Sequence, residues 1–177
     1  SEPSAMPYGT LYRHQLRDVH LLLNEQLHIH ADGIDATHEE YTSCELDEVL
    51  ILSRHVSASN TPALTLHAIG IPGETPHGEE GIAGGSKGTV VPPSPRFASL
   101  FRGILAEGRS RGLDDEYDLT LETTHHGPVL STPTLYIEIG SSVKQWKSKA
   151  AGDAGASVIS DNLGLDGAEP VSWEAGG

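Results

Sequence analysis

The sequence predicts an α/β fold, organised as a single domain in which a mixed, largely parallel sheet is flanked by helices. Its 177 residues suffice for one domain with a sizeable core, and 37% of them are hydrophobic. Apolar segments of strand length come first, then an amphipathic helix, two further strands and a last helix. This order is typical of a sheet covered by helices. The 20 glycines and 11 prolines indicate long connections.

The N-terminal part predicts a flexible lead over residues 1–15, followed by one or two strands within 16–30. The second segment, LRDVHLLLNEQLHIH, contains a short apolar run and an alternating tail. Because side chains alternate along a strand, His28 and His30 would share one face. An exposed edge strand with polar residues outward explains that pair better than a metal site.

Two further strands are predicted by β-rich apolar runs at residues 48–55, EVLILSRH, and 62–70, PALTLHAIG. A polar loop at 57–61 separates them. Residues 71–95 follow as a long Gly/Pro loop. A loop of this length is uncommon in a compact domain and is usually functional or mobile.

A helix is predicted directly after this loop, with Ser94 as its cap and Pro95 at its first position. Gly108 or Gly112 would end it. Five apolar residues then fall on one stripe of the helix, namely Phe97, Leu100, Phe101, Ile104 and Leu105.

Strands are predicted again over 117–124 and 134–139. The first alternates, with Leu119 and Leu121 on one face and Thr120 and Glu122 on the other. The second, TLYIEI, is bounded by a proline and a glycine. A final helix is predicted from Ser142, with Trp146 and Ala150 facing inward.

The charge is unevenly distributed along the chain. The formal net charge is −14, yet residues 87–149 carry 8 basic and 7 acidic side chains. The other segments, 1–86 and 150–177, are strongly acidic. Two interpretations stay open: an acidic surface that only keeps the protein soluble, or a local basic patch for a polyanionic substrate.

Cysteine and hydropathy restrict the compartment. With Cys44 as its single cysteine, the chain can form neither an internal disulfide nor a cysteine-based zinc site. No apolar run approaches the roughly 20 residues that span a bilayer, and no secretory signal is recognisable. We therefore expect a reducing compartment, the cytoplasm or an organelle. The 10 histidines direct any metal chemistry toward nitrogen and oxygen ligands.

Chemically capable side chains gather where strands are predicted to end. In open α/β sheets, ligands bind outside the carboxyl ends of the strands. Histidines and a carboxylate could there hold Zn²⁺ or act as an acid/base pair. Backbone amides at Gly140 and Ser141 could meet an anion. The residues concerned are His55, His67, His125, His126 and Glu138.

Simpler interpretations compete at several of these positions. His67 suits a satisfied core histidine, and Glu138 suits the outward residue of an edge strand with Arg54 as its salt-bridge partner. His125 and His126 serve no obvious packing need before the Gly-Pro that follows them. The residues by themselves indicate a hydrolase or a metal site.

Several separated motifs resemble the archaeal and plant type of D-aminoacyl-tRNA deacylase. ETTHHGP and PTLYIEIGSSVKQW match the family most specifically. Further upstream, LILSRHVSASNTPALTLHAIGIPG, GGSKGTVVPPSPR and VHLLLNEQLHIHADGID resemble its earlier segments. The resemblance covers most of residues 18–165, so we expect a deacylase-like domain over 16–165 and an acidic tail over 166–177.

This resemblance implies a zinc-dependent hydrolase that cleaves the ester between a D-amino acid and the 3′ end of tRNA, a proofreading step in translation. It also implies a fold related to peptidyl-tRNA hydrolase and the phosphorylases. Spacing alone does not decide which histidines bind metal and which move protons. The residues that the resemblance suggests are His55, His67 and His125 for the metal, His126, Glu138 and Ser141 for catalysis, and Lys87, Arg96, Arg102 and Lys144 for tRNA.

Two motifs of the family are not recognisable in the sequence. Its opening strand is not found, and the chain stops where the family's Gly-Gly-Gly-His-Tyr motif would begin. The sequence is thus expected to be either part of a working enzyme or a catalytically inactive relative that serves as an interaction subunit of a larger assembly. A metal-dependent hydrolase of another ester is a further alternative.

Overall fold

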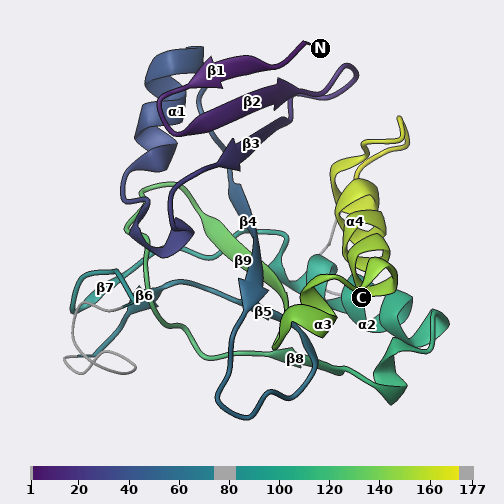
Figure 1. The fold of residues 1–177 in the computed structure, drawn as a ribbon. Helices are drawn as coiled ribbons and strands as arrows, with labels where there is room; N and C mark the ends of the chain where they lie inside the picture. The colour runs from purple at the N-terminus through teal and green to yellow at the C-terminus, as the bar shows by residue number, and fades with distance from the viewer. Residues whose placement is uncertain (1, 74–82, 172–177) are drawn as a thin grey trace. The chain divides into compact units, whose positions relative to one another are not determined.

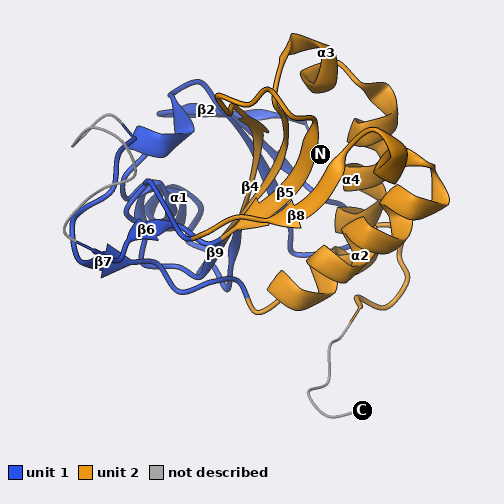
Figure 2. Ribbon diagram, turned by 90° about the horizontal axis from the view of Figure 1, so that it is seen from below, with its two compact units in different colours: residues 1–49, 68–94, 124–134 blue, residues 50–67, 95–123, 135–177 orange. Residues whose placement is uncertain are grey.

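The computed structural model describes residues 2–73 and 83–171, and it has the α/β class expected from the sequence. Its residues form two compact units (Figure 2). Unit 1 contains residues 1–49, 68–94 and 124–134, and unit 2 contains residues 50–67, 95–123 and 135–177.

Unit 1 opens with a three-stranded antiparallel sheet of β1 (Ser4–Met6), β2 (Gly9–Arg13) and β3 (His20–Asn24), in that order. A flexible lead was expected over residues 1–15, but this prediction is wrong where β1 and β2 form. Leu11 is only 1% exposed, and it stands opposite Leu22 in the register of β2 and β3. Burial of this side chain and the strand pairing order the segment.

The rest of unit 1 is largely short elements joined by loops. The segment expected to be a strand around His28 and His30 is instead a 3₁₀ helix, His28–His30. The amide of His30 donates to the carbonyl of Leu27, which closes a turn that a strand could not contain. The other elements are α1 (Ile34–Thr42), β6 (Gly70–Ile71) and β7 (Thr89–Val90), with β6 and β7 antiparallel. The expected loop over 71–95 contains β7 but lies partly outside the described residues.

A four-stranded mixed sheet provides the frame of unit 2. Its strands are β4 (Val49–His55), β5 (Ala63–His67), β8 (Asp118–Leu121) and β9 (Thr134–Gly140), in the spatial order β4-β9-β5-β8. β5 pairs with β8 in parallel and with β9 antiparallel. The four strands were predicted from their apolar patterns, and the mixed character of the sheet is confirmed.

Helices cover the apolar face of this sheet. They are α2 (Phe97–Ser110) and α4 (Lys149–Leu163), and the short helix α3 (Val143–Trp146) precedes α4 in the chain. α2 and α4 lie side by side (Figure 1), so closely that a Cβ added to Gly103 would lie 2.6 Å from Cγ1 of Val158. The core between helices and sheet contains Leu64, Leu66, Leu100, Ile104, Leu135, Ile137, Ala151, Ala154 and Val158.

The predicted helix boundaries need two corrections. The hydroxyl of Ser94 does not cap α2, because it donates to a carboxylate oxygen of Glu48 at 2.5 Å and the helix begins at Phe97. After α3 the chain starts a new helix, in which the hydroxyl of Ser148 accepts from the amide of Ala151. This restart places Ala151 in the core instead of the expected Ala150.

Within the described part of the chain, no helix has both the length and the apolar character that crossing a membrane requires.

Candidate functional site

The four-stranded sheet has two chemically different faces. Because side chains alternate along a strand, the leucines and isoleucines of β5 and β9 face the helices, while the residues between them face the other way. The register places Thr65 opposite Glu138 and His67 opposite Tyr136. One face of the sheet therefore carries a row of polar residues, namely His55, Thr65, His67, Glu122, Tyr136 and Glu138.

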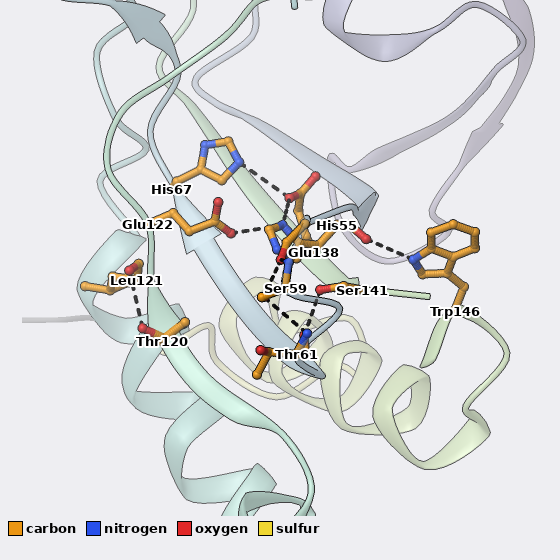
Figure 3. Close-up of polar contacts among 11 residues, drawn as sticks. His55, Ser59, Thr61, His67, Thr120, Leu121, Glu122, Glu138, Ser141 and Trp146 are labelled. Carbon is orange, nitrogen blue, oxygen red and sulfur yellow. Dashed lines mark hydrogen bonds and ion pairs between the residues drawn. The ribbon is translucent and has the colours of Figure 1, made fainter. Parts of the chain in front are cut away.

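The imidazole of His55 lies between two carboxylates on this polar face (Figure 3). Its Nδ1 is 3.3 Å from Oε2 of Glu138 and 3.2 Å from Oε1 of Glu122. The side chains of His55, Glu122 and Glu138 are 15%, 22% and 5% exposed, respectively. The cluster is thus mostly buried, with Glu122 as its most accessible member.

A second histidine reaches the same carboxylate from β5. Nε2 of His67 lies 3.6 Å from Oε2 of Glu138. Its ring stacks on Tyr136, with 5.0 Å between the ring centroids and 19° between the planes. Both rings are fully buried, so this cross-strand pair restricts how the imidazole can turn.

The cluster strongly favours an ionised Glu138. Burial alone would raise the pKa of this carboxyl, but hydrogen bonds from His55, His67 and Ser53 outweigh burial and lower it. The hydrogen bond to Glu138 and the charge of Glu122 raise the pKa of His55 against the opposing effect of burial. Burial, together with the charge of Glu138, raises the pKa of Tyr136, which keeps its phenol neutral.

The last residue of β4 is held from the other side by Trp146. The indole N–H of this residue donates to the carbonyl oxygen of His55 at 3.0 Å. The guanidinium carbon of Arg54 lies 5.1 Å from the centroid of the Trp146 ring. Arg54, which the sequence suggested as a salt-bridge partner of Glu138, thus contacts an aromatic ring. The side chains of His55 and His67 lie beside the Glu138 carboxylate instead.

Ser141 lies at the opposite end of β5 from His67. Because β9 runs antiparallel to β5, Gly140 pairs with Ala63, the first residue of β5. The buried hydroxyl of Ser141 donates to the carbonyl oxygen of Thr61 at 2.7 Å. This hydrogen bond fixes the loop before β5. Ser141 would have met the histidines at one edge of the sheet only if β9 had run parallel to β5.

His125 and His126 belong to unit 1, where they mark the end of an extended segment. His125 forms a parallel bridge with Ile69, and the carbonyl oxygen of His126 accepts from the amide of Gly70 at 2.8 Å. At His126 φ is +45°, outside the extended region. The turn brings the two imidazoles against each other, 4.5 Å apart between centroids. Nδ1 of His126 donates to the carbonyl of Gly127 at 2.6 Å.

The donor atoms of the carboxylate cluster form a possible metal-binding group. His55, Glu122 and Glu138 each offer one ligand atom, and these atoms all lie within 4.8 Å of one another. One imidazole nitrogen and two carboxylate oxygens are a donor set that Zn²⁺ accepts. The chemistry of the donors therefore fits the metal that the resemblance implies.

The four cationic residues suggested for tRNA have different environments. In unit 2, Arg96 donates from Nη1 to the carbonyl of Asn162 at 2.7 Å, and Lys144 pairs with Glu116 at 2.6 Å. Arg102 is exposed on α2. Lys87 is exposed in unit 1. Arg96 thus stabilises the fold, whereas the other three keep exposed positions.

The sequence did not indicate Glu122 as a site residue, nor the contact between Arg54 and Trp146. Glu122 was placed on the polar face of its strand, and its position three residues before His125 could have marked it as a candidate. The contact of Arg54 with Trp146 joins distant segments, so no local pattern could have indicated it.

Comparisons with known proteins identify the family of the chain. The sequence profile of the D-aminoacyl-tRNA deacylase family matches residues 42–177. A D-aminoacyl-tRNA deacylase of Arabidopsis thaliana is 41% identical over 145 residues, which are 81% of this chain and 45% of that protein. The chain belongs to the D-aminoacyl-tRNA deacylase family. The resemblance that the motifs indicated is thereby confirmed.

Other members of the family and one solved structure extend the comparison. A D-aminoacyl-tRNA deacylase of Methanoculleus marisnigri is 40% identical over 132 residues, covering 74% of this chain and 26% of that protein. The chain thus spans less than half the length of these two curated relatives. A crystal structure of a conserved protein of unknown function has the same fold, with a TM-score of 0.72 and 27% identity, over 97% of this chain and 56% of that one.

Proposed function

We propose that the chain hydrolyses the ester of D-aminoacyl-tRNA and so releases the D-amino acid and free tRNA. One observation carries the proposal: a member of this family holds the imidazole of His55 between the carboxylates of Glu122 and Glu138. Two ionisable carboxylates and an imidazole are sufficient to activate water. The D-aminoacyl-tRNA deacylases to which the chain is similar supply the substrate class.

We propose that His55, Glu122 and Glu138 hold a zinc ion, and that His67 positions Glu138. When bound, Zn²⁺ would supply a Lewis acid that favours deprotonation of water. The lowered pKa of Glu138 suits this carboxylate to hold the ion, and we propose that the more accessible carboxylate of Glu122, with the oxygen that does not hold the ion, accepts the proton that the attacking water loses. The water oxygen bonds to the carbonyl carbon of the ester, the bond from this carbon to the ribose oxygen breaks, and Glu122 passes the proton to the ribose oxygen, which completes the hydrolysis.

The remaining candidates enter the proposal from the sequence resemblance. His125 is proposed as a further metal ligand and His126 as a proton carrier. Ser141 is proposed to hold the loop before β5 through its hydrogen bond to Thr61. Lys87, Arg102 and Lys144 are proposed to meet tRNA phosphates, together with the less accessible Arg96.

The reaction is tested with D-tyrosyl-tRNA, by following release of the D-amino acid before and after treatment with a chelator. We expect release by the untreated protein, loss after chelation, and recovery on addition of Zn²⁺. Absence of release by the untreated protein would contradict the proposed reaction and favour a non-catalytic role for the chain. Release that chelation leaves unchanged would contradict the zinc requirement only.

The metal site is tested separately by measuring bound zinc in the purified protein. Glu122→Gln and Glu138→Gln should each lower the zinc content, because an amide oxygen is a poorer ligand than a carboxylate. Asp118→Asn is the matched control, since this exposed residue lies on β8, close in sequence to Glu122. Equal zinc content in all of these variants would exclude the cluster as the metal site.

A further inference from the structure

An exposed cation and an aromatic ring meet at the end of β4, on unit 2. Arg54 is exposed and Trp146 is partly exposed, with 5.1 Å between the guanidinium carbon and the ring centroid. The indole N–H of Trp146 holds the carbonyl of His55 at 3.0 Å. The pair is therefore tied to the same residue whose imidazole meets the two carboxylates.

The surroundings of this pair are cationic and apolar. Three lysines, Lys144, Lys147 and Lys149, lie around Trp146 in the sequence. Lys144 pairs with Glu116 and Lys149 with Asp153, so the positive charge beside the pair comes mainly from the exposed Lys147. Leu52 and Val56, close to Arg54 on the same strand or just after it, are 55% and 72% exposed. These two apolar side chains lie on either side of Arg54 along the chain and can contact a planar ligand placed against its guanidinium.

This combination suits a nucleobase. Proteins that bind unpaired nucleic acid stack bases on aromatic rings and arginine guanidinium groups, and they place cations along the phosphates. The guanidinium of Arg54 lies over the indole of Trp146, and because Arg54 is exposed, its planar group can meet a second planar group. An unpaired base at the end of a nucleic acid chain offers such a planar group.

We infer that Arg54 and Trp146 form a stacking platform for the base of the 3′-terminal nucleotide of tRNA. The inference rests on the proposed function, because the ester that would be hydrolysed is on the ribose of that nucleotide. Neighbouring residues of a strand face opposite sides, so Arg54 and His55 lie on either side of β4. β4 is the edge strand of its sheet, and one nucleotide could reach around it, with its base at Arg54 and its ester near His55.

Binding is tested with uncharged tRNA, so that no hydrolysis is needed. The chain has two tryptophans, and Trp173→Phe leaves Trp146 as the fluorescent reporter. We expect intact tRNA to quench this fluorescence, and tRNA trimmed of its terminal adenosine to quench it markedly less. Equal quenching by both would overturn the platform. Quenching that depends on the terminal nucleotide, in a protein that releases no D-amino acid, would support the platform while the proposed reaction fails.

Kinetics then separate base stacking from simple charge. Arg54→Gln should raise KM for D-tyrosyl-tRNA about tenfold, with kcat nearly unchanged, which is the scale of one lost base stack. Lys147→Gln removes an equal charge from an exposed position beside Trp146, and we expect a smaller change in KM. Arg54→Lys retains the charge without the planar group and should resemble Arg54→Gln.

Trp146 needs its own variant, because its N–H also holds His55. Trp146→Phe keeps an aromatic face but loses the hydrogen bond to the His55 carbonyl, so it should lower kcat more than it changes KM. If Arg54→Gln and Lys147→Gln raise KM equally, the pair contributes only charge and the platform is overturned.

Discussion

Gly140 and His55 pack so closely that a Cβ added to Gly140 would lie 2.5 Å from Cβ of His55 and 2.7 Å from its ring. Real Cβ atoms do not approach so closely, so one of the two residues would have to move. Gly140 thus allows the imidazole of His55 to lie over the end of β9, where it reaches Glu138 at 3.3 Å. The first prediction follows from this contact.

Gly140→Ala should displace His55 and lower the rate of D-tyrosyl-tRNA hydrolysis about 10²-fold, the scale expected for a displaced catalytic group. The free energy of unfolding should also fall, by about 1–3 kcal/mol, as for overpacking. Gly152→Ala is the matched control, because a Cβ there meets nothing within 4 Å. The control should retain activity and gain stability, since alanine is the better helix former. A fully active Gly140→Ala variant would show that the position of His55 is not critical.

The strands that carry this site could be predicted, because alternation of apolar and polar residues is a local signal. His55 ends β4 as expected, whereas β5 ends at His67, before the predicted end of its strand at residue 70. The direction of β9 depends on pairing between distant segments, and nothing in its own sequence encodes it. The sequence therefore suggested that Glu138 and Ser141 meet the histidines at one edge of the sheet. In the structure, Glu138 contacts His55 and His67 from within β9. Ser141 lies at the other end of β5, next to Thr61.

The strands β1 and β2 near the N-terminus are a second feature that the sequence did not predict. β1 and β2 are short and contain few apolar residues, so their pattern resembles a lead. Their order comes from pairing with β3 and from burial of Leu11. The sequence did not indicate Glu122 as a site residue, because this role too depends on how distant strands pair. Its role as a neighbour of His55 arises from the sheet order, which places β8 beside β5.

A second prediction concerns the contact between α2 and α4. The hydroxyl of Ser99 donates to Oδ1 of Asn162 at 2.6 Å, and both residues are buried. Ser99→Ala leaves this buried oxygen without that donor, so the free energy of unfolding should fall by about 1–3 kcal/mol. Ser110→Ala is the control on the same helix, because its hydroxyl is exposed. Urea denaturation of both variants checks the difference, and equal stability would mean that water replaces the lost hydroxyl.

A third prediction concerns Asp35, a buried carboxylate of α1. One of its oxygens accepts the amides of Ser131 at 2.7 Å and Thr132 at 2.9 Å, and the side chain is 3% exposed. Burial would raise the pKa of this carboxyl, but the backbone hydrogen bonds outweigh burial and lower it. Asp35→Asn should therefore reduce the free energy of unfolding by about 1–3 kcal/mol near neutral pH.

The control for Asp35 is Asp32→Asn. Asp32 also accepts a backbone amide, from Val129 at 2.7 Å, but it is exposed. Its loss should change stability by less than about 0.5 kcal/mol. Because the pKa of Asp35 is lowered from 3.8, its contribution is present above that pH and is lost as the pH falls through the folded pKa. A difference between the Asp35 variant and wild type that persists unchanged in strong acid would refute this account.

The fourth prediction concerns a histidine pair in unit 1. Nδ1 of His20 on β3 lies 2.8 Å from Nε2 of His38 on α1, and His38 is 6% exposed. One ring must donate and the other must accept, so the pair cannot keep its hydrogen bond when both rings are protonated. Burial lowers the pKa of both rings below 6.5, and Arg13 adds to the effect against the opposing charges of Asp18 and Glu39.

The sign of the pH dependence follows from these lowered values. Well above pH 6.5 both rings are neutral in the folded and the unfolded chain. As the pH falls below that value, the unfolded chain binds protons that the folded pair resists, so the free energy of unfolding decreases. His38→Gln cannot titrate and should lose less stability than wild type between about pH 7.5 and about pH 5.5. Parallel urea denaturation at both pH values measures this difference, and identical losses in the two proteins would show that the pair does not sense pH.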